Sequence, residues 1–96
     1  MPPTVNQLLF SDAATNKLGA RAISREDCRQ LLANGSVLAP NPHAGQPDRR
    51  LLIGSTNGGR VLTVVVEPTL DPADWLVVTG WESTERERKM FQRNRV

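Results

Sequence analysis

The sequence predicts an α+β domain in which two N-terminal helices precede an antiparallel sheet of three or four strands and a C-terminal helix. Three observations support this. Apolar residues recur at helical spacing before residue 34, β-branched segments follow within residues 50–81, and a capping sequence at Thr84 opens a charged segment. With 96 residues, the chain is expected to form one domain over residues 1–96.

The first predicted elements are a short strand over Val5–Leu9 and a helix that starts at Ser11 or Asp12. The helix follows from Ala14, Leu18 and Ala22, which recur every four residues and so share one helical face, with a turn expected near Ile23.

A second helix begins at Ser24, which has the side chain of an N-cap, with Asp27 three residues on as its capping-box partner. Asn34-Gly35 ends this helix, because glycine is the usual residue just past a helix C-terminus. Its apolar face consists of Cys28, Leu31 and Leu32.

The second half of the chain is predicted to form a β-sheet. Thr56-Asn57-Gly58-Gly59 predicts a hairpin, since Asn and Gly tolerate positive φ. The uninterrupted run Val64–Val66 indicates a central strand covered on both faces, and Trp75 and Trp81 are expected on one strand face. The predicted strands are Ser36–Ala39, Arg50–Ser55, Arg60–Val66 and Trp75–Trp81, with an exposed loop over Pro40–Asp48.

The last helix begins at Thr84, where Thr84 and Glu87 form a capping box. Only Met90 and Phe91 are apolar, a thin stripe for such a helix. The helix is expected either to lie lightly on the sheet or to dock on another chain.

Composition excludes several chemistries. One His and one Cys cannot supply the four ligands of a structural zinc site, and no phosphate-binding glycine motif is present. No metal or cofactor is expected. Cys28 is predicted to be a buried, inert thiol. No apolar run approaches the ~18 residues of a membrane span, and the N-terminus lacks a signal peptide pattern, so a reducing cytoplasm is the expected location.

The net charge of +2 is unevenly distributed, and ten of the twelve cations are Arg. One cluster surrounds the predicted hairpin strands, and a second follows Glu82. These clusters indicate either a solvated surface or a phosphate-binding face. Their members are Arg49, Arg50 and Arg60, and then Arg86, Arg88, Lys89, Arg93 and Arg95.

Two stretches resemble the BrnT toxins and their uncharacterised relatives in the RelE/ParE toxin superfamily. The stretch from Phe10 to Asp27 resembles the pattern F-T-x-H-A…R-G-I-S-x-E-D. Residues 50–91 resemble the R-x-L-x-I-G, G-R-x-L-x-V-V and T-x-R-E-R-x-x-Y/F segments in the same order. The resemblance implies a RelE-like fold with helices on one face of an antiparallel sheet. It also implies a toxin of a type II toxin–antitoxin pair that acts on RNA or translation, with an antitoxin as its partner.

Five positions depart from these patterns, and the changes remove or replace ionisable groups. Ala13 replaces the family His, Trp81 replaces an Arg, and Phe91 replaces a Tyr, while Ala20-Arg21 stands where Lys-His is frequent. The sequence therefore favours two hypotheses. One is a ribonuclease toxin that inhibits translation by RNA cleavage, and the other is a module of the same fold that binds a protein or RNA without cutting. Assembly with a second copy of the chain is left open.

RNA cleavage needs a group that activates the 2′-OH and cations that stabilise the phosphate. The predicted catalytic residues are Arg88, Arg50, Arg60 and Glu82, with the three arginines expected to converge on one spot. Other proton-transfer groups are His43, in a loop, and Glu67, Glu85 and Glu87, of which Glu87 is expected to serve as a helix cap. The residues predicted to bind RNA or a partner are Arg86, Lys89, Arg93 and Trp81.

Overall fold

The protein is described by a computed structural model over residues 5–42, 45 and 48–94. The described elements are β1 (Gln7–Phe10), α1 (Asp12–Gly19), α2 (Arg25–Ala33), β2 (Val37–Pro40), β3 (Arg50–Ser55), β4 (Val61–Pro68), β5 (Asp74–Glu82) and α3 (Glu85–Asn94). Each predicted helix is present, and the mixed α and β content is confirmed. Within the described residues, no helix combines the length and apolar character that crossing a membrane requires.

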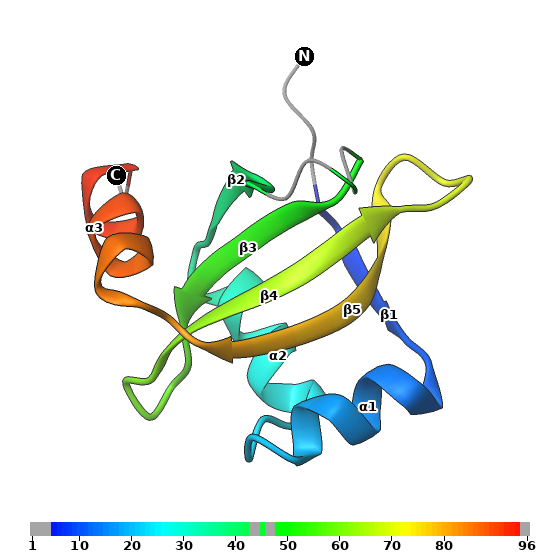
Figure 1. Ribbon diagram of the computed structural model, residues 1–96, viewed down its shortest axis with the longest axis horizontal. Helices are drawn as coiled ribbons and strands as arrows, with labels where there is room; N and C mark the ends of the chain where they lie inside the picture. Colours follow the sequence, from blue (N-terminus) through cyan, green and yellow to red (C-terminus); the bar gives the residue numbers. More distant parts are fainter. Residues whose placement is uncertain (1–4, 43–44, 46–47, 95–96) are drawn as a thin grey trace.

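The five strands form one sheet in the order β1-β5-β4-β3-β2 (Figure 1). The prediction of three or four antiparallel strands is wrong in number and in one pairing. Although β2, β3, β4 and β5 are antiparallel neighbours, β1 pairs with β5 in parallel. The four-residue β1 precedes both N-terminal helices and joins the last strand of the chain, so no local turn signals this pairing.

Helices cover both faces of the sheet. The first apolar cluster joins α1 and α2 to one face through Leu18, Cys28 and Leu31, all fully buried. The second cluster lies on the opposite face, where Phe91 of α3 packs with Leu51, Ile53 and Val65. The expectation of helices on one face is therefore wrong, because the thin Met90–Phe91 stripe seats α3 on the other side (Figure 1).

The strand β4 is covered on both faces, as its Val-rich run predicts. Val64 and Val66 belong to the first cluster, and Val65 belongs to the second. The hairpin that leads into β4 also has its predicted form: Thr56 N–H donates to the Arg60 carbonyl at 2.9 Å, and Gly59 has a φ of 89°. Only a residue without a Cβ adopts that φ at no steric cost.

A β-bulge at Val78 changes which face the end of β5 presents. Val65 pairs with Thr79 and Val66 with Val77, so Val78 is an extra residue on β5. Trp75, before the bulge, packs in the first cluster, whereas Trp81, after it, packs in the second, beside α3. The prediction that both tryptophans share one face is wrong for this reason, and the consequence is an aromatic ring next to the basic helix.

The expectation that Ala22 continues the first helix is wrong, because α1 ends at Gly19. The turn between α1 and α2 instead holds Ala22 at a φ of 56°, a left-handed conformation that its Cβ disfavours. The related motif has Gly at this position. Ala22→Gly is expected to raise the free energy of unfolding by about 0.5–1 kcal/mol, because relief of the Cβ clash outweighs the greater entropy of glycine in the unfolded chain. Urea denaturation measures the change, and a variant less stable than the wild type would contradict this account.

Candidate functional site

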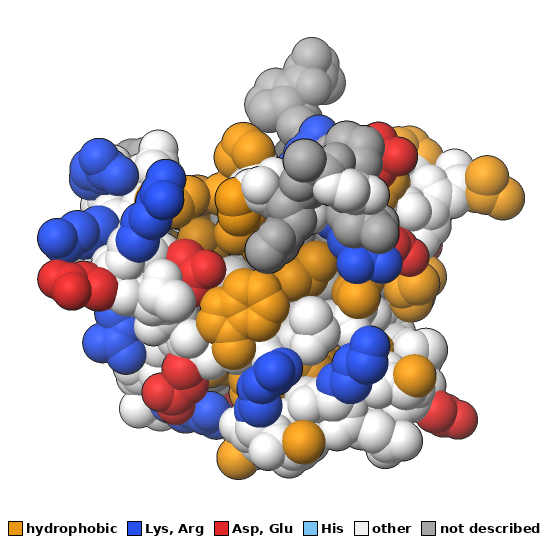
Figure 2. Space-filling view, viewed as in Figure 1, with side chains coloured by type: hydrophobic (Ala, Val, Ile, Leu, Met, Phe, Trp, Pro, Cys, Tyr) orange, Lys and Arg blue, Asp and Glu red, His pale blue; other side chains and the backbone are white. Residues whose placement is uncertain are grey.

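A groove runs along α3 on the second face of the sheet. It encloses a cavity of about 140 Å³ whose walls include Pro40 of β2, Leu51 of β3, and Arg86, Glu87 and Met90 of α3. Figure 2 shows basic side chains gathered over α3 beside an apolar strip of the molecule. We call this feature the α3 groove.

Glu87 is the polar centre of the α3 groove. Its Oε1 accepts hydrogen bonds from the backbone N–H of Thr84 at 2.8 Å, from the Trp81 Nε1–H at 3.0 Å and from the Thr63 hydroxyl at 3.0 Å. The Glu87 N–H is in turn 3.2 Å from the Thr84 hydroxyl oxygen, which completes the predicted capping box. One carboxylate therefore joins the start of α3 to β4 and to the end of β5.

The same contacts determine the protonation of Glu87. Partial burial alone would raise the pKa of this carboxyl, but the hydrogen bonds from Thr84, Trp81 and Thr63 outweigh burial, and the pKa is lowered from its ordinary value. A carboxylate with three donors and a lowered pKa is a weak proton acceptor, so Glu87 serves here as an anchor.

Trp81 is joined to the α3 groove through Glu87, and its only polar side-chain atom is already bonded. The ring is half-buried against the second cluster, and its Nε1–H points to Glu87. The exposed part of the ring therefore carries no unsatisfied hydrogen-bonding group.

The cations of α3 divide between two sides of the helix. Arg86, Lys89 and Arg93 line a shallow hollow of about 340 Å³ on its outer face, and Arg86 also lines the cavity of the α3 groove. Lys89 pairs loosely with Glu85 at 3.5 Å, with both side chains mostly exposed. Arg88 lies about 200° around the helix from Arg86. It is exposed and lines neither hollow, and none of the described residues forms an ion pair with it.

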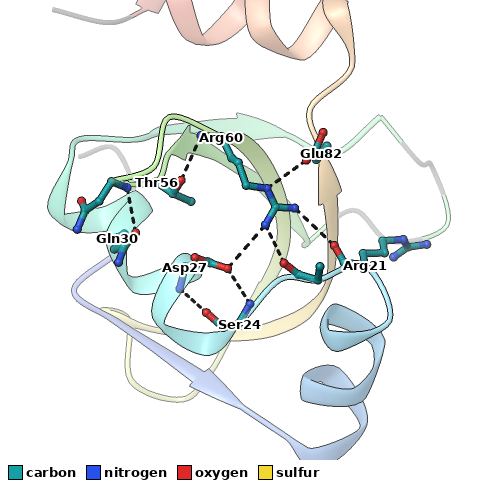
Figure 3. A network of polar contacts seen from close by, with 9 residues as sticks. Arg21, Ser24, Asp27, Gln30, Thr56, Arg60 and Glu82 are labelled. Atoms are coloured by element: carbon teal, nitrogen blue, oxygen red, sulfur yellow. Dashed lines mark hydrogen bonds and ion pairs between the residues drawn. The ribbon is translucent and has the colours of Figure 1, made fainter.

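Arg60 and Glu82 are brought together, but within a structural network that ties the hairpin to α2 (Figure 3). The Arg60 Nε donates to Glu82 at 3.1 Å, and its Nη1 donates to the Ala22 carbonyl at 2.7 Å and lies 3.9 Å from Asp27. Asp27 also accepts from the Ser24 N–H in the α2 capping box. We call these contacts the Arg60 clamp, since they hold the α1–α2 turn against the hairpin.

The predicted convergence of three arginines is wrong. Arg50 lies opposite Val66, while Arg60 precedes Val61, so the two occupy opposite ends of the β3–β4 pair, roughly 17 Å apart along the strands. A hairpin brings strands side by side but places its first and last residues far from the turn. Arg50 donates to the Arg49 carbonyl, and Arg49 pairs with Glu67 at 3.1 Å.

Two further residues that the sequence analysis considered are Cys28 and His43. Cys28 is fully buried, and burial raises its pKa to about 12, which keeps the thiol protonated and inert as predicted. His43 lies outside the described residues. Among the described residues, no cluster of His, Cys, Asp or Glu could hold a metal ion.

Two functional contacts had no recognisable sequence signal. Thr63 lies inside a β-branched run that reads as apolar, yet its buried hydroxyl contacts Glu87 and Ser83. Arg21 donates to the Gly80 carbonyl at 2.9 Å and so covers part of the β5 edge beyond its pairing with β1.

The Arg60 clamp implies a structural role that a variant can reveal. Arg60→Ala is expected to lower the free energy of unfolding by about 1–3 kcal/mol, because it leaves the Ala22 carbonyl and Glu82 without their donor. Arg86→Ala, at an exposed position, is the matched control and should change stability by less than about 0.5 kcal/mol. Equal free energies of unfolding for the two variants in urea would show that the Arg60 clamp does not stabilise the fold.

The lowered pKa of Glu87 predicts a pH-dependent contribution to stability. A carboxyl whose pKa falls on folding stabilises the fold above its unfolded pKa, about 4.3, and loses that contribution as pH falls through the folded value. The gap in unfolding free energy between the wild type and Glu87→Gln should be steady from pH 7 to 5 and shrink below about pH 4. Urea titrations at a series of pH values measure it, and a gap that stays constant down to pH 3 would refute this role.

The chain is similar in fold to a solved toxin structure. It matches the crystal structure of the Brucella abortus ribonuclease toxin BrnT with a TM-score of 0.59 and 16% identity, over 82% of this chain and 97% of that chain. This confirms the resemblance to BrnT at the level of fold. No curated protein matches the chain.

A family model described as a domain of unknown function, DUF4258, matches residues 10–81. The match runs from the end of β1 to Trp81, and so includes β2, β3, β4, β5 without its last residue, and the Arg60 clamp except for Glu82. The chain belongs to the DUF4258 family.

Proposed function

We propose that the protein is the toxin of a type II toxin–antitoxin pair and acts as a ribonuclease that inhibits translation in the cytoplasm. The observation that carries this proposal is the shared fold with a ribonuclease toxin, which extends over nearly the whole of that toxin. The cognate antitoxin is the proposed protein partner, and RNA is the proposed substrate.

The cations of α3 give this proposal its chemistry. Arg86, Lys89 and Arg93 are exposed, and they lie together on one side of the helix, where phosphate groups could approach without displacing any buried contact. Arginine offers planar, bidentate donors to phosphate oxygens. Arg88, on the other side of α3, remains the predicted catalytic cation. Arg50 and Arg60 are engaged by neighbouring protein groups and are left out of the proposed phosphate site.

A second function, RNA or protein binding without cleavage, is favoured by the state of the carboxylates. Within the described residues, Glu67 and Glu82 are paired with arginines, and Glu87 holds three donors with a lowered pKa. General-base catalysis wants a group whose pKa lies near the working pH. The α3 groove has Arg86 in its wall and the Trp81 ring bonded to its carboxylate, but that carboxylate is a weak base.

Induced expression in a bacterium tests the proposed function. The wild type is expected to arrest growth with loss of cellular RNA, and the triple variant Arg86→Ala, Lys89→Ala, Arg93→Ala should abolish arrest, because it removes the exposed phosphate-binding charge. Lys17→Ala, Arg25→Ala, Arg29→Ala removes the same charge from α1 and α2 and should arrest growth like the wild type. Both variants are first checked for an unchanged melting temperature.

The purified protein with labelled RNA separates the two candidate functions. Shortened RNA fragments support the ribonuclease. A stable complex with intact RNA supports the binding module. Unimpeded growth together with no RNA binding would refute both the ribonuclease and the RNA-binding module, and would leave protein binding as the function.

A further inference from the structure

Trp81 lies near the end of β5, and its ring is half-buried beside α3. The bulge at Val78 turns the ring toward α3, and Glu87 fixes the ring by accepting from its Nε1–H at 3.0 Å. A flat aromatic surface is thereby held at a set orientation, with no polar group left to satisfy. Such a ring can offer a binding partner its π face but no further hydrogen bond.

The helix that holds this ring is basic on its outer side. Arg86 directly precedes Glu87, which accepts from the ring N–H, and both residues line the cavity of the α3 groove. Lys89 and Arg93 follow on the outer side of the helix, three and seven residues from Arg86. At 1.5 Å per residue, these three cations span roughly 10 Å along α3. A row of cations on the helix that anchors an aromatic ring supplies the two elements with which proteins bind single-stranded nucleic acid, where phosphates follow the charges and a base stacks on the ring.

We infer that Trp81 is a stacking platform for an unpaired base of single-stranded RNA whose backbone follows Arg86, Lys89 and Arg93. This inference rests on the proposed action on RNA and names the form of RNA that the site takes. An acidic peptide would also be attracted by these charges, but the indole N–H, the one donor the ring could give a peptide, is already occupied by Glu87.

The inference favours a single strand over a duplex for a physical reason. Bases in a duplex are stacked on one another and present only their edges, so they cannot lie on a side-chain ring. A single strand leaves its bases free to leave the stack and settle on Trp81, while its phosphates still reach the α3 cations.

Binding of a fluorescein-labelled 12-nucleotide single-stranded RNA and of the matching duplex, measured by anisotropy, tests the inference. If Trp81 stacks on a base, Trp81→Ala should weaken single-strand binding by about 5- to 150-fold and leave duplex binding nearly unchanged. Trp81→Phe keeps an aromatic face and should retain most of the affinity. Lys17→Ala, which removes an exposed cation from α1, should bind like the wild type.

A second readout reports on the ring itself. In a Trp75→Phe background, Trp81 is the remaining tryptophan, and its fluorescence should be quenched when single-stranded RNA binds. If that background fails to fold, as circular dichroism would reveal, the anisotropy measurement decides alone.

The outcomes separate this inference from the proposed function. Wild-type binding of single-stranded RNA that Trp81→Ala leaves intact would overturn the stacking platform and leave the proposed function standing. Equal losses for single strand and duplex would also overturn it, since they would assign Trp81 a general structural role. Absence of RNA binding by the wild type, with capture of an acidic peptide instead, would overturn both.

Discussion

The carboxylate of Glu87 is the contact on which the second face of the molecule depends. Thr63 is fully buried in the central strand, and its hydroxyl would be costly to bury without a partner. Glu87 and Ser83 provide partners at 3.0 and 2.8 Å. The same Glu87 oxygen also caps α3 and accepts from the Trp81 ring. The position of the helix on the sheet and the orientation of the aromatic side chain therefore depend on one carboxylate.

The arginines of this chain divide by what surrounds them. Arg60 is enclosed by two carbonyls and two carboxylates, and Arg21 donates to the Gly80 carbonyl at the β5 edge. Both guanidinium groups therefore serve to hold the fold together. Arg86 and Arg93 instead stand exposed on a ten-residue helix that buries only Phe91. Exposed cations without acidic partners contribute little to the stability of the fold. They leave the α3 face positively charged, and this charge suits it to an anionic ligand.

Local signals account for what the sequence predicted well. The hairpin at Asn57-Gly58 and the capping boxes at Ser24 and Thr84 are determined by residues within four positions of one another, and the structure contains each of them. Cys28 was likewise correctly predicted as an inert core thiol, since its apolar helix face is readable from spacing alone.

Most of the errors arise from contacts between distant residues. The parallel pairing of β1 with β5 joins Gln7 to Asp74, and the Arg60 clamp joins residues 22 and 60, separations over which spacing carries no information. The bulge at Val78 matters most, because one extra residue reverses the side-chain alternation of β5 and moves Trp81 to the opposite face. The α3 groove was therefore hidden from the sequence, although Arg86 and Trp81 are among the residues that the sequence predicts to bind RNA or a partner.

The central claim is that one face of the molecule, formed by α3 and Trp81, binds RNA. The most direct measurement is an NMR titration of the ¹⁵N-labelled protein with single-stranded RNA, in which the Trp81 indole N–H gives a resolved signal of its own. The account predicts shifts of that signal and of the α3 backbone amides from Glu85 to Arg93, with α1 and α2 unchanged. Shifts confined to α1, α2 or the Asn57-Gly58 hairpin would contradict it.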